Sequence, residues 1–226
     1  MTPNRIIGLS DGRFRLDGGA MFGVVPRVLW ERANPPDASN RILLGMNCLL
    51  IEGQGFRILV DTGVGDKEDD AFADMFALER TATLLDELAA RGLRPEDITH
   101  VVNTHLHIDH SGCNELFPNA LSYAHRFEEP PIGSTRISGA LTLLPGVEIV
   151  PTPGHTEGSI SVFVSAEKRY AICGDAIPTK ANYDAHVPPF VAFDKNLATK
   201  SMEMILDWAQ VVVPGHGDPF DVLRKR

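Results

Sequence analysis

Short apolar runs recur along the chain and are separated by glycine, proline and polar residues, a pattern typical of buried strands. Gly53-Gln54-Gly55 lies between two such runs and predicts a hairpin that joins residues 47–52 to 56–61. A second predicted hairpin joins residues 159–165 to 169–174 through a turn near Glu167-Lys168. Further strands are predicted at 98–104, 121–125, 147–151 and 210–215.

Two segments instead place apolar residues at helical spacing. Within residues 80–91, Leu84, Leu85 and Leu88 share one stripe, and the glycine that follows favours a helix end. Residues 196–209 form a second amphipathic segment. Strands and helices together predict one mixed α/β domain over residues 1–226.

Proline pairs and polar residues predict loops at 31–40 and 126–139. The opening stretch LDGGAMFGVVP, residues 16–26, contains apolar residues that would suit the core of a first hairpin. A second interpretation of this stretch concerns the substrate.

Composition changes this picture little. A hydrophobic content of 43% and a charged content of 23% are ordinary for a globular domain, and no run reaches the roughly 18 apolar residues of a membrane span. Three cysteines without CxxC spacing indicate neither a disulfide framework nor a zinc finger, and they fit a reducing compartment. The first residues lack the basic and apolar stretches of a secretory signal. We therefore expect a soluble, cytoplasmic protein that does not associate with membranes.

Charge argues against nucleic acid as a partner. The net charge is −9, and lysine and arginine cluster only in the RKR at residues 224–226. The expected partner is a small-molecule substrate.

The stretch NTHLHIDHSG, residues 103–112, contains four residues that can bind metal within six positions: His105, His107, Asp109 and His110. His105 and His107 are two apart, so in extended backbone they project to the same side and can share one ion. Asp109 and His110 point in different directions and are better placed for a second ion. Chance would explain one histidine in a polar loop, but four such residues favour a metal site.

Three more candidate ligands follow predicted strands, and each has a glycine before it. His155 follows the strand at 147–151, Asp175 follows the strand at 169–174, and His216 follows the strand at 210–215. Strands that end in this way would bring all seven side chains to one edge of a sheet.

With these residues the chain resembles the metallo-β-lactamase-fold hydrolase superfamily. The resemblance depends on HLHIDH as the family's HxHxDH motif, on GH at 154–155, GD at 174–175 and GH at 215–216, and on LVDTG at 59–63. The motifs occur in the family's order and extend over residues 47–217.

The resemblance implies an αβ/βα four-layer sandwich of two mixed sheets, with helices outside and a binuclear metal centre at one edge. It assigns the first ion to His105, His107 and His155. It assigns the second ion to Asp109, His110 and His216, with Asp175 as a bridge between the two ions. Asp61, in LVDTG, would orient a ligand histidine. Nitrogen and oxygen donors without thiolate suit zinc, and they also accept iron, cobalt or manganese.

Such a centre implies hydrolysis. Two cations can share a hydroxide at neutral pH and polarise the oxygen of a carbonyl or phosphoryl group. Asp109 would orient this nucleophile or carry its proton to the leaving group.

The opening stretch at 16–26 resembles that of the lactonase-like branch, whose members open acyl-homoserine lactones or related esters. Met21 and Phe22, which look exposed, would then line an apolar cleft. Pro178 stands where many lactonases have a tyrosine that contacts the substrate, so Tyr183 is the nearest candidate for that role. His186 also follows the bridging aspartate and is a further candidate.

Two other functions stay open. The chain could be a generic metal-dependent esterase or phosphoesterase of the same fold, or a non-catalytic module that senses a metal or ligand. The complete ligand set favours an enzyme, because loss of catalysis usually begins with loss of ligands. The apolar stretch at 21–30 fits a homodimer interface as well as a substrate cleft.

Overall fold

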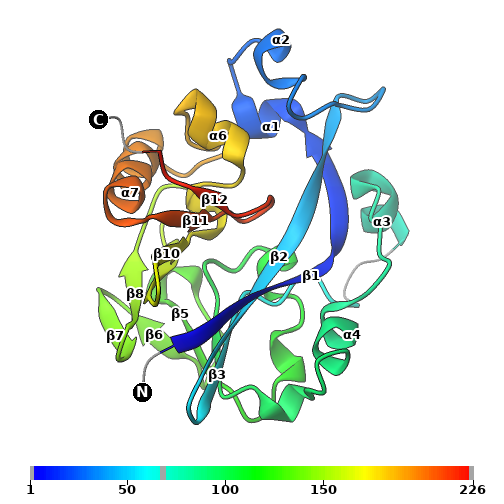
Figure 1. Ribbon diagram of the computed structural model, residues 1–226. Helices are drawn as coiled ribbons and strands as arrows, with labels where there is room; N and C mark the ends of the chain where they lie inside the picture. Colours follow the sequence, from blue (N-terminus) through cyan, green and yellow to red (C-terminus); the bar gives the residue numbers. More distant parts are fainter. Residues whose placement is uncertain (1–2, 67–69, 224–226) are drawn as a thin grey trace.

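The computed structural model describes residues 3–66 and 70–223, which fold into two six-stranded sheets (Figure 1). The RKR stretch at 224–226 lies outside these residues. The first sheet contains, in spatial order, β1 (Pro3–Asp17), β2 (Arg41–Gly53), β3 (Phe56–Val60), β4 (His100–Val102), β5 (Leu121–His125) and β6 (Thr135–Ile137). The second contains β12 (Phe220–Asp221), β11 (Val211–Val213), β10 (Arg169–Ile172), β9 (Ile160–Ser165), β8 (Val147–Pro151) and β7 (Leu141–Leu144).

Helical segments connect these strands. The α-helices are α1 (Gly18–Phe22), α2 (Arg27–Trp30), α3 (Asp70–Phe76), α4 (Leu84–Ala89), α5 (Ile108–Ser111), α6 (Lys180–Ala185) and α7 (Lys195–Trp208). The 3₁₀ turns are η1 (Pro95–Asp97), η2 (Asn114–Leu116), η3 (Arg126–Glu128) and η4 (Gly174–Ala176). No helix among the described residues is long and apolar enough to cross a bilayer, and a cytoplasmic location stays a prediction.

Both sheets are mixed, and their strand directions place the functional loops. In the first sheet β3, β4, β5 and β6 run parallel, so the chain leaves each of them at the same edge. In the second sheet β10 and β11 are the parallel pair, and the other neighbours are antiparallel. The segments that follow β4, β10 and β11 contain six of the seven predicted ligands, and the segment that follows β3 contains Asp61, their predicted support.

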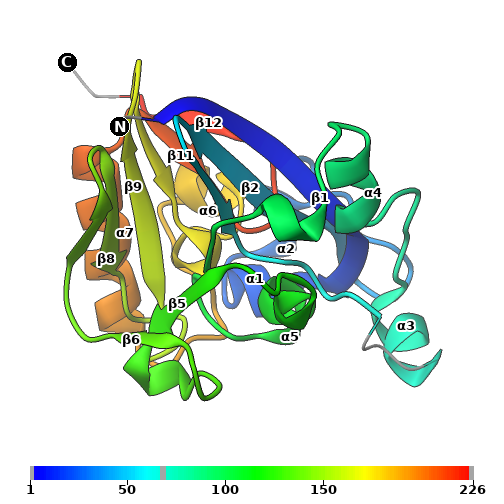
Figure 2. The ribbon, with the colours of Figure 1, turned by 90° about the horizontal axis from the view of Figure 1, so that it is seen from below.

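The main core lies between the two sheets. It packs Ile58 and Val102 of the first sheet against Val162 and Ile172 of the second. Helix α4 covers the outer face of the first sheet through Leu84 and Leu88, as a separate cluster shows. Helix α7 covers the outer face of the second sheet, and Figure 2 shows these two helices on opposite outer sides of the strands. The predicted α/β four-layer sandwich is therefore confirmed.

Most predicted elements are present, with shifted ends. Strands β5 and β8 have the predicted bounds, whereas β4 keeps only three residues. The helix predicted at 80–91 begins at Leu84, because Thr83 caps it: the Thr83 side chain accepts from the Asp86 N–H, and the Asp86 carboxylate accepts from the Thr83 N–H. Residues 126–139 are predicted as a loop, but in the structure they also contain η3 and β6.

Strand β1 is the largest element that the sequence pattern did not predict. Its alternation breaks at Asp11 and Gly12, where the pairing with β2 shifts register between Ser10 and Arg13. The first-hairpin interpretation of residues 16–26 is wrong, because β1 ends at Asp17 and α1 follows directly. The Asp17 carboxylate accepts from the Gly19 N–H at 2.7 Å and so stops the strand.

Candidate metal centre

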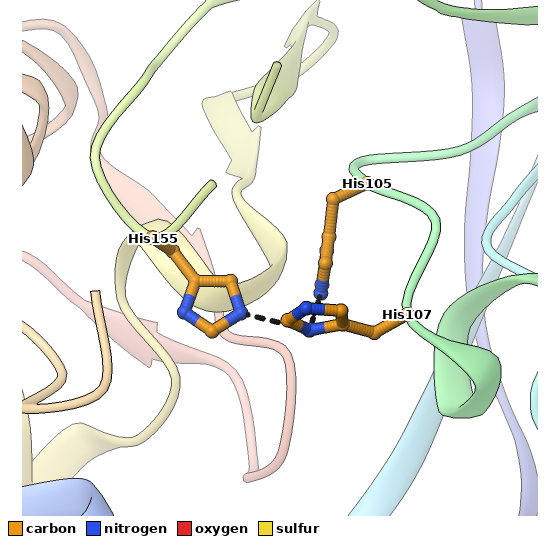
Figure 3. Close-up of side chains that lie close together, drawn as sticks. All are labelled: His105, His107 and His155. Carbon is orange, nitrogen blue, oxygen red and sulfur yellow. Dashed lines mark hydrogen bonds between the residues drawn. The ribbon is translucent and has the colours of Figure 1, made fainter. Parts of the chain in front are cut away.

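Three histidines converge at the edge of the sandwich from two different loops (Figure 3). His105 and His107 lie in the segment between β4 and α5, whereas His155 lies between β8 and β9. His107 Nδ1 is 3.0 Å from His105 Nε2 and 3.1 Å from His155 Nε2. Nitrogens bound to one tetrahedral zinc ion at the usual 2.0–2.1 Å would lie roughly 3.3 Å apart. These three atoms therefore fit a common cation.

A second group lies beside the first. Asp109 Oδ2 is 3.6 Å from His110 Nε2 and 3.7 Å from His216 Nε2. Within this group, and within the three-histidine group, one ligand atom from each residue lies within 4.8 Å of those of the other two. The structure thus brings together two sets of three candidate ligands, and their assignment to two ions stays a prediction.

Asp175 lies between the two groups. Its carboxylate is 3.0 Å from His216 Nε2 and 3.5 Å from His110 Nε2 through Oδ1, and 3.4 Å from His155 Nε2 through Oδ2. One carboxylate therefore reaches both groups, which is the position that a bridging ligand needs.

Two inward-facing atoms of this cluster have no hydrogen-bond partner among the described residues: His110 Nε2 and Asp175 Oδ1. A buried polar atom without a partner costs about 1–3 kcal/mol. A cation coordinated by both atoms would remove that cost. Together with a donor set of imidazole nitrogens and carboxylate oxygens, this indicates that the residues fit two divalent ions.

The outer nitrogens of three ligand histidines are held by fixed acceptors. His110 Nδ1 donates to Asp61 Oδ2 at 2.8 Å, His216 Nδ1 to the Gly45 carbonyl at 2.9 Å, and His155 Nδ1 to the Val191 carbonyl at 3.0 Å. With Nδ1 carrying the proton, each ring presents its Nε2 lone pair to the centre.

Asp61 has the most contacts of these acceptors. It follows β3 in a left-handed backbone conformation, with φ 59°, and its carboxylate is buried. Besides His110, it accepts from the Thr104 N–H at 2.7 Å and the Thr104 hydroxyl at 2.8 Å. Asp61 thereby joins the end of β3 to the start of the histidine loop.

Two glycines explain why GD and GH precede ligands here. A Cβ at Gly174 would lie 2.3 Å from Thr104 Oγ1, and a Cβ at Gly215 would lie 2.4 Å from Asp175 Oδ1. Because Gly174 also has φ +47°, any side chain there would be strained as well as crowded. Gly174 thus lets the second sheet approach the histidine loop closely, and Gly215 lets the segment after β11 approach the turn that contains Asp175.

Burial and neighbouring charges divide the pKa values of the cluster. Burial alone would lower the pKa of His110 and His216, but nearby carboxylates outweigh burial and raise both pKa values. The carboxylates are Asp109 and Asp61 for His110, and Asp175 for His216. Burial opposes ionisation of Asp175, yet His216 and His155 hold its pKa well below its usual range. Burial lowers the pKa of His105 and His155.

A cavity of about 230 Å³ opens over the cluster. At its base lies the ligand floor, the name used here for all seven candidate ligands, of which five line the cavity: His107, Asp109, His155, Asp175 and His216. We call its other lining the apolar wall, which comes from β1, α1, β2, α3, α5 and the segment before α7: Phe14, Leu16, Ala20, Met21, Met46, Phe76, Ile108, Pro189 and Val191.

The four predicted substrate contacts fall in different places. Met21 lines the cavity, but Phe22 stacks on Trp30 with ring centroids 5.1 Å apart and does not line it. Both side chains are only 3% exposed, so the expectation that they are exposed is wrong. They lie on α1, whose buried side packs against β1 and β2.

Tyr183 and His186 do not line this cavity. Tyr183 packs against Phe220 at 4.8 Å between ring centroids, and its hydroxyl accepts from the Leu223 N–H. His186 is exposed, ends α6, and borders a different depression together with Tyr183.

Most of the apolar wall was missed from the sequence. Ile42, Leu44 and Met46 do alternate with less buried residues along β2, a signal that could have extended the predicted strand toward the site. Phe76 and Val191 offered no such signal, because they come from a short helix and an irregular segment that pack at the cavity only in the folded chain.

Comparison with known proteins identifies relatives. The model of the metallo-beta-lactamase superfamily matches residues 42–130. An N-acyl homoserine lactonase of Bacillus cereus is 30% identical over 250 residues, covering 96% of this chain and 94% of the lactonase. A probable metal-dependent hydrolase from Staphylococcus aureus, 22% identical, superimposes with a TM-score of 0.85 over 96% of this chain and 91% of its own.

A further solved structure contains a ligand. It is a variant of AiiA from B. thuringiensis with N-decanoyl-L-homoserine bound at the active site. It is 25% identical to this chain and superimposes with a TM-score of 0.78, covering 96% of this chain and 94% of its own.

Proposed function

The chain belongs to the metallo-beta-lactamase superfamily and is a metallo-hydrolase, and from this premise we propose that it opens neutral lactones with an apolar tail. Acyl-homoserine lactones are the first substrate class to test. The proposed cofactor is a pair of divalent ions, zinc by preference, held by the three-histidine group and by Asp109, His110 and His216, with Asp175 between them.

The observation that carries the proposal is the combination of floor and wall in one cavity. Every polar side chain that lines the cavity belongs to the ligand set, and the remaining lining residues are apolar. A substrate that fits such a cavity has one reactive polar group, directed to the floor, and an apolar remainder. A lactone with an acyl tail has this shape.

Two bound divalent ions would supply a nucleophile at neutral pH and stabilise charge on the attacked oxygen. The protein's own residues complete the reaction. Asp109 lines the cavity, and its carboxylate can accept a proton from the attacking water and return it to the alkoxide released when the ring C–O bond breaks. Asp61 and the Gly45 and Val191 carbonyls hold the histidine rings in place during this transfer.

The wall also supports a choice among substrates. No lysine or arginine lines the cavity in the described part of the chain. A substrate that carries a charge away from its reacting group is therefore poorly matched, since that charge would be buried against apolar side chains.

The test is a pH-stat assay of the zinc-reconstituted protein with acyl-homoserine lactones of short and long chain, beside a simple aryl ester and a phosphotriester. We expect the lactones to have the highest kcat/KM and the long-chain lactone to have the lower KM. Turnover of the aryl ester with no lactone signal would contradict the lactonase proposal.

A second candidate is a generic esterase for neutral substrates. It is favoured by the position of Tyr183, which leaves the cavity lining without a phenolic hydroxyl to direct a lactone oxygen. The same assay separates the two, because a generic esterase would prefer the activated aryl ester.

The homodimer stays a proposal for the stretch at 21–30. Val24, Val28 and Leu29 are 91%, 72% and 71% exposed in the single chain, which is a large apolar exposure for three neighbouring residues. Light scattering would give twice the chain mass if this stretch forms an interface.

A further inference from the structure

Glu128 joins the two loops that supply the three-histidine group. One of its carboxylate oxygens, Oε2, accepts from the Leu106 N–H at 2.9 Å. The other, Oε1, accepts from the Thr156 hydroxyl at 2.5 Å. Leu106 stands between His105 and His107 in the chain, and Thr156 directly follows His155. A single side chain thus contacts the backbone or side chain next to every histidine of this group.

The position of Glu128 follows from the sheet. Strands β4 and β5 are parallel neighbours, so the histidine loop after β4 and the η3 turn after β5 emerge at the same edge. The His125 ring at the end of β5 accepts from the Phe127 N–H and starts η3. This turn directs Glu128 toward the loop between β8 and β9 in the other sheet, where a Cβ at Gly158 would lie 2.6 Å from Glu128 Oε1.

The link crosses between the two sheets, and so does the three-histidine group. The 3.1 Å separation of His107 Nδ1 from His155 Nε2 depends on how the loop of one sheet stands relative to the loop of the other. Near this point the described residues show one direct backbone bond between the sheets, from the Ile160 N–H to the Thr104 carbonyl at 2.8 Å. Glu128 adds two bonds, one to Leu106 between His105 and His107 and one to Thr156 beside His155.

The second ligand group has different support. His110 is held by Asp61, and His216 by the Gly45 carbonyl. Both hydrogen bonds of the Glu128 carboxylate within the described residues go to the loops of the three-histidine group.

We propose that Glu128 is a positioning residue that sets the affinity of the three-histidine group for its ion, by fixing the distance between the loop of His105 and His107 and the loop of His155. This inference depends on the proposed metal centre and not on the identity of the substrate.

Four variants test it. Glu128→Gln keeps the volume but loses the charge: its oxygen can still accept from the Leu106 N–H, whereas its NH2 can only donate to Thr156, whose hydroxyl must then turn its hydrogen to Ser159, so the charge-assisted bond between the two loops is lost. Thr156→Val removes the hydroxyl at nearly constant shape. His155→Ala removes a proposed ligand of the three-histidine group, so the step of the chelator curve that it changes is the step of that group's ion. Glu129→Gln is the matched control, because it removes an exposed carboxylate one position along the chain.

The measurement is the number of zinc ions retained per chain as the concentration of a competing chelator rises, which requires no substrate. We expect two steps for the wild-type chain. Glu128→Gln should move one step by about tenfold or more, the usual effect of losing a group that orients metal ligands. Thr156→Val should move the same step by less, and Glu129→Gln should move neither.

The double variant shows which of the two zinc ions depends on Glu128. Glu128→Gln combined with His155→Ala should release its remaining zinc at the same chelator concentration as His155→Ala alone, because the second group does not depend on Glu128. A Glu128→Gln curve that matches the wild type, or one in which both steps move together, would overturn the proposal. If Glu128→Gln does not fold, Thr156→Val decides between the same outcomes. A wild-type chain that retains no zinc would instead contradict the proposed function.

Discussion

The ligand floor and the apolar wall of the cavity are built in different ways. Floor residues stand in short loops at strand ends, and three of the histidines have a fixed acceptor: Asp61 for His110, and backbone carbonyls for His155 and His216. Wall residues come from six separate segments between Phe14 and Val191, and their apolar side chains are held by packing. The comparison teaches that reaction type is encoded locally in this chain, whereas substrate preference is encoded by long-range packing.

The largest effect should come from changing the floor itself. Asp109→Asn and His105→Ala should each lower kcat/KM by roughly a thousandfold or more, because they remove a ligand and, for Asp109, the proposed proton carrier. The circular dichroism spectrum should stay that of the folded chain. Full activity in either variant would contradict the assignment of the floor.

A smaller effect should come from the support of the floor. Asp61→Asn keeps the shape but replaces one acceptor oxygen of a group that holds Thr104 and His110. We expect zinc affinity to fall about 10–100-fold, with a parallel loss of activity at limiting zinc that excess zinc partly restores. An unchanged affinity would show that His110 is oriented without Asp61.

Protonation gives a third test of the floor. His110 and His216 have raised pKa values in the metal-free chain, so they keep protons to a higher pH than an ordinary histidine would. Metal ligands must be deprotonated, so zinc binding near neutral pH should release protons, and affinity should rise as pH rises through these raised pKa values. Calorimetry in buffers of different ionisation enthalpy measures the release; zinc binding with no protons released would count against it.

The smallest effect should come from the wall. Leu16→Ala removes apolar surface that lines the cavity, and contact with this surface would contribute about 1–2 kcal/mol to the binding free energy of an acyl tail. The KM for a long-chain acyl-homoserine lactone should rise about tenfold, while kcat and the KM for a short-chain lactone change little. Tyr183→Phe is the control outside the cavity and should alter neither value. Equal changes for both chain lengths would remove Leu16 from tail binding.

The sequence predicted the floor because its chemistry is concentrated in short motifs. Four of the seven ligands occur within residues 105–110, and the other three follow strands whose apolar runs are plain. Parallel pairing of β3 with β4 and of β10 with β11 explains why strand ends meet within each sheet. The meeting of the two sheets, and the place of His155 after the antiparallel strand β8, come from the packing of the sandwich. The fold class followed from the same motifs through resemblance.

The wall could not be predicted in the same way. Phe14 and Leu16 stand on β1, whose pattern is broken by the bulge at Asp11 and Gly12, and Met21 looks like part of an exposed turn until α1 is packed. For Tyr183 the sequence predicted a contact that the fold does not make. Tyr183 is close to Asp175 in the sequence and was therefore predicted at the site, but its ring on α6 packs against Phe220. Sequence distance from a ligand is a poor guide to the direction of a side chain.

The central claim is that a two-ion floor opens a lactone beneath an apolar wall. The most direct test measures zinc per chain and the pH-stat rate of acyl-homoserine lactone opening on the same samples, from the metal-free chain to the fully loaded one. We predict two zinc ions per fully loaded chain, and a rate that is lost on metal removal and returns as zinc is restored. Lactone opening that persists in the metal-free chain, or two bound zinc ions with no lactone opening, would contradict it.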